Sequence, residues 1–245
     1  MRPWQRTQST REVCVQKAQG WRYRLGAFPH RWRCSHDPPP LTETGIPTAP
    51  FHPGRWLDAN WPYAGAVCAA FLALLFPLIL GTWRPELVLL YLLNTAYLIH
   101  QVEEHYRDRF RHFVNLHVAA GANALTPRAV TVVNVGLVWL LFMLALLAAG
   151  LLDVGFGLAI VYTSLLNAVV HVVGAVALRR YNPGLVTGVL LFVPLGSAAL
   201  IRVSSASGLG ATGQVIGVVV AVLGHAAILV EVRRRLAYIQ HASTP

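Results

Sequence analysis

Six long apolar stretches, separated by short polar or Gly- and Pro-containing segments, dominate the sequence after its first quarter. Each is close to the length of about 20 residues that an α-helix needs to cross about 30 Å of bilayer hydrocarbon. The pattern predicts an all-α protein, a polytopic transmembrane helix bundle. The predicted spans are Trp61 to Gly81, Glu86 to Val102, Val130 to Gly150, Phe156 to Leu178, Leu185 to Ile201 and Gln214 to Val232.

Positive charges are distributed very unevenly among the segments that join these spans. Of the 20 Lys and Arg residues, all but Arg84 and Arg202 fall on one side of the predicted bundle. Because cytoplasmic segments are enriched in Lys and Arg, we expect both termini in the cytoplasm and a multi-pass protein of the cell membrane. The net charge of +10 is then explained by the orientation of the protein in the membrane, and nucleic acid is not an expected partner.

The first 59 residues differ from the rest because they are rich in Arg and Pro and lack the apolar run of a signal peptide. We interpret residues 1–59 as a disordered, basic, Pro-rich cytoplasmic tail. Residues 60–236 are the predicted six-helix transmembrane domain, and residues 237–245 are a short C-terminal tail. The basic tail suits contact with anionic membrane lipids, but a stretch upstream of the true start would have the same composition. Both readings stay open.

The overall composition excludes several classes of protein. Hydrophobic residues make up 55% and charged residues 12%, against about a quarter charged in soluble domains, so a wholly disordered chain is excluded. Three cysteines are too few for a disulfide framework. Arg greatly outnumbers Lys, which is associated with GC-rich bacterial genomes.

Few ionisable side chains fall inside the predicted spans, and each is costly in hydrocarbon and therefore a candidate functional residue. At the end of the second span, His100, Glu103 and Glu104 fall within an arc of about 100° on the helix. One imidazole and two carboxylates are therefore predicted to point the same way. His105 lies about 140° from His100 and is expected to face elsewhere.

Polar side chains on three other predicted spans lie at a similar depth. Asn167 and His171 share one face of the fourth span, His225 lies on the sixth, and Asn134 lies near the start of the third. At a rise of 1.5 Å per residue, all of them fall in one broad layer toward the cytoplasmic side. We expect this layer to form a buried polar pocket.

Two segments resemble a known family. The run from His100 to Glu104 matches the motif of the HXXEE-domain membrane proteins. Asn167 and His171, followed by the segment from Arg180 to Gly184 and by Thr187, resemble that family's second motif block. The similarity covers about residues 60 to 236. The resemblance implies a polytopic membrane protein with a suspected active site, and it implies no particular substrate or reaction.

The residues themselves favour a metal-dependent enzyme. His100, Glu103, Glu104, His171 and His225 are the predicted ligands of Zn²⁺ or non-haem iron. The predicted catalytic residues are His100, Glu103 and Glu104, since a carboxylate not bound to the metal can act as a general base. Asn134 and Asn167 are expected to orient the histidines. A site near the cytoplasmic leaflet suits a hydrolase or oxidase with a lipid-like substrate.

Other interpretations of the same residues stay open. His100 and Glu104 without a metal form an acid and base pair. A chain of buried Glu and His side chains is also typical of a proton- or cation-coupled transporter. In a structural membrane subunit, the same cluster would lock neighbouring helices together through polar contacts.

Overall fold

The computed structural model describes residues 52–242. The tail predicted for residues 1–59 therefore lies outside the described residues except at its end, where helix α2 starts at Pro53. At the other end of the chain, helix α10 (Ala211–Ala242) extends beyond residue 236 into the predicted C-terminal tail. The helical part of the chain thus extends beyond residues 60–236, the predicted transmembrane domain, at both ends.

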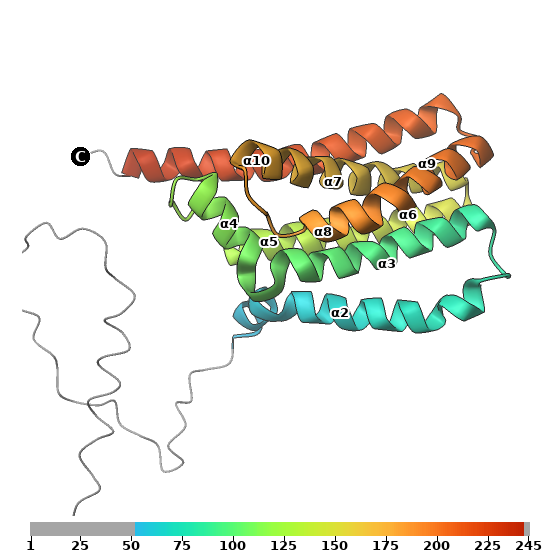
Figure 1. The fold of residues 1–245 in the computed structure, drawn as a ribbon, viewed down its shortest axis with the longest axis horizontal. Coiled ribbons are helices and arrows are strands. Elements are labelled where there is room, and N and C mark those ends of the chain that lie inside the picture. The colour runs from blue at the N-terminus through green and yellow to red at the C-terminus, as the bar shows by residue number, and fades with distance from the viewer. Residues whose placement is uncertain (1–51, 243–245) are drawn as a thin grey trace, which may run out of the picture. The chain divides into compact units, whose positions relative to one another are not determined.

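All regular structure in the described residues is helical, which confirms the predicted all-α class. Figure 1 shows the long helices running side by side. In chain order the elements are α2 (Pro53–Ile79), α3 (Pro85–His105), η1 (Tyr106–Asp108), α4 (Arg109–His117), α5 (Pro127–Thr131), the π-helical η2 (Val132–Trp139), α6 (Leu140–Leu151), η3 (Val154–Gly157), α7 (Leu158–Leu178), α8 (Leu185–Thr187), the π-helical η4 (Gly188–Phe192), α9 (Val193–Ala206) and α10.

Five helical segments of residues 52–242 are long and apolar enough to cross a membrane: Pro53–Ile79, Pro127–Leu151, Val154–Leu178, Leu185–Ala206 and Ala211–His241. The predicted count of six is not confirmed, because α3 does not reach the same apolarity. It carries polar side chains such as Thr95, His100 and Gln101, and these are buried against other helices. A helix surrounded by protein can carry polar residues that a lipid-facing helix cannot.

The core of the bundle forms around α3 and α7. Over an apolar window of 18 residues in the segment that contains α7, 56% of the residues are buried, against 17–28% in the corresponding windows of the other four segments. Tyr91 of α3 donates a hydrogen bond to the Leu72 carbonyl of α2, and Asn167 of α7 donates to the Tyr97 hydroxyl of α3. Leu90, Leu93, Leu158 and Ile160 are completely buried in the shared core. Residues on these two helices are therefore held in a fixed relationship.

Large apolar side chains cover the outer surface of the other helices. Leu74 on α2, Leu151 on α6 and Leu223 on α10 are among more than thirty exposed large apolar residues. A soluble domain rarely exposes so much contiguous apolar surface, whereas a bilayer accommodates it. α2 alone spans about 40 Å at 1.5 Å per residue, which exceeds the hydrocarbon thickness.

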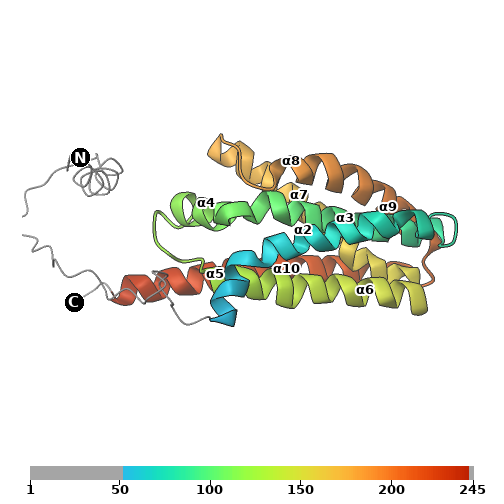
Figure 2. The ribbon, with the colours of Figure 1, turned by 90° about the horizontal axis from the view of Figure 1, so that it is seen from below.

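A sharp corner follows α3 at one end of the bundle. Arg107 and Asp108 both adopt the left-handed conformation, with φ of 54° and 62°, although neither is glycine. The chain turns there into the short helix α4, and Figures 1 and 2 show α4 at the end where α10 finishes. The corner ends α3 immediately after the polar residues that the sequence singled out.

Candidate metal centre

Three ionisable side chains from α3 and α7 meet inside the bundle. His100 and Glu104 lie one helical turn apart on α3, and His171 lies on α7. Oxygens of the Glu104 carboxylate lie 3.5 Å from His100 Nε2 and 3.6 Å from His171 Nε2. One possible ligand atom from each residue lies within 4.8 Å of the other two, and all three side chains are buried. This group can hold a single metal ion.

The Thr187 hydroxyl determines which nitrogen of His100 carries the proton. Thr187 Oγ1 lies 2.5 Å from Glu103 Oε2, and a carboxylate only accepts, so the hydroxyl donates there. The same Oγ1 lies 2.8 Å from His100 Nδ1 and has no second proton to donate. His100 Nδ1 therefore carries a proton and donates it to Thr187. In the neutral ring, the Nε2 lone pair then faces Glu104.

Asn182 determines which nitrogen of His171 carries the proton. The Asn182 amide nitrogen donates to the His171 backbone carbonyl at 2.9 Å, which fixes the orientation of the amide group. Asn182 Oδ1 is then the atom 2.9 Å from His171 Nδ1, so Nδ1 is the donor of that hydrogen bond. His171 Nε2 is left as a lone pair that faces Glu104. Histidine ligands of metals in proteins are oriented in this way by a hydrogen bond from the second ring nitrogen.

The three atoms that converge are thus all electron-pair donors. The separations of 3.5 and 3.6 Å between Glu104 and the two imidazoles are longer than good hydrogen bonds. A bound cation would stabilise buried electron-pair donors that face one another at such distances. Two imidazole nitrogens and one carboxylate are a ligand set found around Zn²⁺ and around non-haem iron.

Glu103 points away from this group and is saturated by other hydrogen bonds. Its Oε2 accepts from the Thr187 backbone N–H at 2.8 Å as well as from the hydroxyl, and its Oε1 accepts from the Tyr181 hydroxyl at 2.6 Å and from Val186 N–H at 3.2 Å. Burial, and to a smaller extent the hydrogen bond to Glu103, raises the pKa of Tyr181 to about 12. The Tyr181 hydroxyl therefore keeps its proton and remains a donor at neutral pH. Glu103 holds the segment that carries Thr187.

His105 does contact the site, and the expectation that it faces elsewhere is wrong. Its Nε2 lies 3.1 Å from Glu104 Oε2, and its ring packs at 4.8 Å from Trp61 and 5.4 Å from Phe110. The helical arc measured from His100 did not reveal this, because His105 is the last residue of α3 and lies directly beside Glu104 in the chain. The position of His105 next to Glu104 in the sequence is the feature that could have indicated this contact.

The two predicted orienting asparagines lie in different places. Asn167 Nδ2 lies 3.4 Å from His100 Nε2 and 3.1 Å from the Tyr97 hydroxyl, at the edge of the three-residue group. Asn134 accepts a hydrogen bond from Gln101 at 2.9 Å, and Gln101 accepts one from the Trp139 indole. The structure therefore brings Asn167 to a histidine of the group, whereas Asn134 belongs to a neighbouring network.

His225, the fifth predicted ligand, lies outside the three-residue group. Its Nδ1 is 2.9 Å from the Ala221 carbonyl one turn earlier in α10, which is a local contact within one helix. His225 nevertheless lines a cavity that also reaches Glu104 and His171. The structure thus places His225 in the lining of the cavity beside the group.

Gly184 lies in the segment that covers the two histidines. Its φ is +98°, a conformation that glycine adopts without strain. A Cβ added there would lie 2.6 Å from His171 Cε1 and 2.8 Å from His100 Cε1. The backbone at Gly184 therefore approaches both rings so closely that a side chain of any size would displace them.

An apolar cavity of about 270 Å³ adjoins the group between α3, α4, η2, α7 and α10. Its polar lining includes Glu104, His171, Asn167 and Asn182, and Phe113, Leu141, Ile228 and other apolar residues make up most of the remainder. Thr163 also lines it, and Thr163 Oγ1 is the single buried side-chain polar atom without a hydrogen-bond partner among residues 52–242. The cavity suits an occupant that is mainly apolar and carries a polar group.

Comparisons with known proteins agree with the motif that supplies the site. Residues 91–199 match the family described as "Protein of unknown function with HXXEE motif". No curated protein and no solved structure matches the chain. The matched range contains His100, Glu104 and His171, together with Asn182 and Thr187, whose hydrogen bonds fix both histidines. Residues 91–199 of this chain are therefore an HXXEE domain.

Proposed function

We propose that this protein is an integral membrane metalloenzyme in which His100, Glu104 and His171 bind a divalent cation and act on a lipid-like substrate. The observation that carries the proposal is the convergence of two imidazole lone pairs and a carboxylate in a buried space. A divalent metal can bind all three donors at once.

The pattern of hydrogen bonds around the group favours a metal site over a polar lock between helices. A lock needs donors and acceptors paired across the interface, and polar atoms left unpaired in a buried site are costly. Here the paired nitrogens of His100 and His171 point outward, to Thr187 and Asn182. The other two ring nitrogens point inward, to the same carboxylate, at 3.5 and 3.6 Å, which is longer than a good hydrogen bond.

The apolar cavity favours a lipid-like substrate. Its lining includes two of the three proposed ligands, Glu104 and His171, and most of its wall is aliphatic or aromatic. The unpartnered Thr163 hydroxyl offers a hydrogen bond to a polar group of the substrate. A metal ion held by His100, Glu104 and His171 would supply Lewis-acid activation of a carbonyl or of a water molecule.

The ligand set suits a hydrolase or an oxidase, and the co-substrate separates them, because the first uses water and the second uses dioxygen. A hydrolase adds water across an ester or amide bond and releases a carboxylate, whereas an oxidase removes two hydrogen atoms from the lipid chain and transfers them to dioxygen, which becomes hydrogen peroxide. The full chain, purified in detergent and loaded with zinc or with iron(II), is incubated with lipid esters and amides in isotopically labelled water. Label in a released fatty acid identifies hydrolysis, and oxygen uptake with an oxidised chain identifies oxidation.

The matched variants are His171→Ala and His112→Ala. His171 is a proposed ligand, whereas His112 is exposed on α4 and contacts Asp108. We expect His171→Ala to abolish product formation with either metal and His112→Ala to retain it. Product formation that is unchanged in His171→Ala, or that survives complete metal removal, would contradict a metal-dependent reaction at this group.

A further inference from the structure

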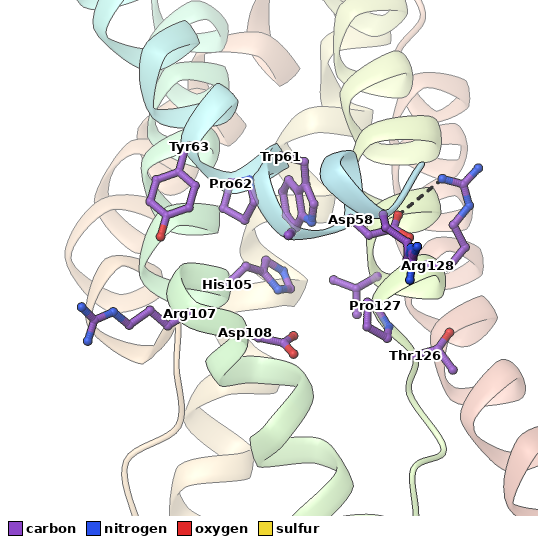
Figure 3. Close-up of a pocket in the computed structure, with 13 residues that line it drawn as sticks. Asp58, Trp61, Pro62, Tyr63, His105, Arg107, Asp108, Thr126, Pro127 and Arg128 are labelled. Atoms are coloured by element: carbon purple, nitrogen blue, oxygen red, sulfur yellow. Dashed lines mark hydrogen bonds and ion pairs between the residues drawn. The ribbon is translucent and has the colours of Figure 1, made fainter. Parts of the chain in front are cut away.

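A second pocket, different in chemistry, opens on the other side of His105. Its volume is about 470 Å³, and its lining comes from the first turns of α2, the corner after α3 and the start of α5. Figure 3 shows Trp61 and His105 beside one another in this pocket, with Asp58 and Arg128 across from them. His105 and Val130 line both this pocket and the apolar cavity, so the two spaces share a wall.

The charges around this pocket favour an anion. Arg55, Arg107 and Arg128 contribute three positive charges to the lining, against two negative charges from Asp58 and Asp108. Asp108 is already bound by Arg111, which lies outside the lining. Asp58 pairs with Arg128. An excess of positive charge therefore remains when both carboxylates are paired with arginines.

Two of the arginines have donors available. Arg55 makes no salt bridge with any residue from 52 to 242, and Arg128 uses a single nitrogen, Nη1, to reach Asp58 at 3.4 Å. A guanidinium has five N–H donors, so most of those on Arg55 and Arg128 are unused. Arg107 is different, because Figure 3 shows its guanidinium pointing away from the other labelled side chains, and it lies over the Tyr106 ring.

The pocket also lies at a level typical of lipid head groups. Trp56 and Tyr63, on the same part of α2, are 57% and 47% exposed. Exposed Trp and Tyr collect where hydrocarbon meets the polar head groups of a bilayer. Farther along α2, the exposed large side chains are aliphatic or Phe, such as Phe71, Leu74 and Leu78. The arginine side chains of the pocket therefore lie near the level at which the apolar surface of α2 ends.

We propose that this pocket binds a phosphate group, with Arg55 and Arg128 as its ligands. The planar guanidinium forms paired hydrogen bonds with phosphate oxygens, and such charge-assisted bonds are stronger than neutral ones. The phosphate belongs either to the head group of a membrane lipid or to free phosphate in solution. This site is separate from the metal group, and its occupancy does not depend on a bound metal.

Binding is measured by native mass spectrometry on the full chain in a neutral detergent. The probes are a phosphatidic acid, the diacylglycerol with the same acyl chains, and inorganic phosphate as a competitor. We expect phosphatidic acid to bind at least about tenfold more tightly than diacylglycerol, since charge-assisted hydrogen bonds to the phosphate are absent from the latter. Competition by inorganic phosphate identifies free phosphate as a ligand, and its absence identifies the lipid head group.

The matched variants remove two positive charges at different places. Arg55→Gln/Arg128→Gln alters the pocket, and Arg233→Gln/Arg234→Gln alters two exposed arginines on α10. We expect the pocket variant to lose phosphatidic acid binding by about tenfold or more and the α10 variant to change by less than about twofold. The single variant Arg55→Gln is expected to weaken binding even if the double variant unfolds. An equal loss in both double variants, no loss with Arg55→Gln, or equal binding of diacylglycerol would overturn the proposal.

Discussion

Glu103 Oε2 accepts a 2.5 Å hydrogen bond from the Thr187 hydroxyl, and this contact sets the direction in which that hydroxyl points. Because the hydroxyl proton is directed to Glu103, Thr187 can only accept from His100 Nδ1. The two adjacent glutamates of the motif therefore take different positions. Glu104 faces the histidines, and Glu103 acts on His100 through Thr187.

This contact predicts the effect of Glu103→Gln. An amide at this position can donate to Thr187 and so reverse the hydroxyl, which favours the wrong tautomer of His100. Loss of such an outer hydrogen bond lowers metal affinity by about 10- to 100-fold in other metalloproteins. We expect the same range for Glu103→Gln, measured by competition with a chelator, while Glu104→Gln should abolish binding.

The control is Glu86→Gln, at the opposite end of α3, where Glu86 pairs with Arg84. It should leave metal affinity unchanged, because it lies far along the helix from His100. If Glu103→Gln empties the site as completely as Glu104→Gln, Glu103 is itself a ligand. That result would contradict the positioning role assigned here.

Gly184→Ala is predicted to disrupt the site without changing any polar residue. A Cβ at Gly184 would lie 2.8 Å from His171 Nε2 as well as close to His100, so both rings must move. Gly81→Ala is the matched control, because Gly81 has a similar φ of +96° with open space around its Cβ position. Both variants carry the same backbone strain, of order 1–2 kcal/mol. Melting temperature should therefore fall in both, and metal content only in Gly184→Ala.

His225→Ala separates the three-residue site from the five-residue site expected from the sequence. His225 contacts the Ala221 carbonyl on its own helix and is not among the three converging residues. We therefore expect His225→Ala to retain metal at the wild-type ratio and His171→Ala to lose it, by elemental analysis of both proteins. A metal-free His225→Ala protein with an unchanged melting temperature would show that a fourth protein ligand exists.

Asp153 predicts a pH dependence of stability at the other end of the bundle. Its carboxylate accepts hydrogen bonds from Gly155 N–H, Gly208 N–H and the Ser207 hydroxyl, and so joins two loops. The bond from Gly155, and then those from Gly208 and Ser207, lower the pKa of Asp153. Stabilisation is therefore complete above the unfolded pKa of about 3.9 and is lost as the pH falls through the lower folded value.

The variant Asp153→Asn tests this dependence. We expect a lower melting temperature than wild type at pH 7 and a difference that narrows below about pH 4. Glu231→Gln, which breaks an exposed one-turn pair with Arg235, should change the melting temperature little at either pH. A difference for Asp153→Asn that is constant across this pH range would argue against a role for its charge.

Much of the helical fold followed from the sequence because apolar runs of membrane length admit few other structures. The placement of His100 and Glu104 together followed from their spacing of four in one helix, and their approach to His171 from a comparison of depths. A helical wheel orders side chains around one axis but does not say which side meets a neighbour. That is why Glu103 and Glu104 were distinguishable only in the structure.

The partners of the histidines were less accessible to sequence reasoning. Asn182 lies in the connection between α7 and α8, and Thr187 ends a helix of three residues, so neither falls on a long periodic face. Gly184, with a positive φ, lies between them in the chain and close to both rings. The resemblance to the second motif block pointed to this segment, but periodicity could not assign hydrogen bonds across it.

Metal content is the most direct test of the central claim. The full chain is purified in detergent without affinity tags that bind metal, and its zinc and iron are measured against protein concentration, alongside His171→Ala and His112→Ala. The account predicts close to one equivalent of one metal in wild type and in His112→Ala, and almost none in His171→Ala. A folded wild-type protein that contains no metal, and takes up none when zinc or iron(II) is added, would contradict it.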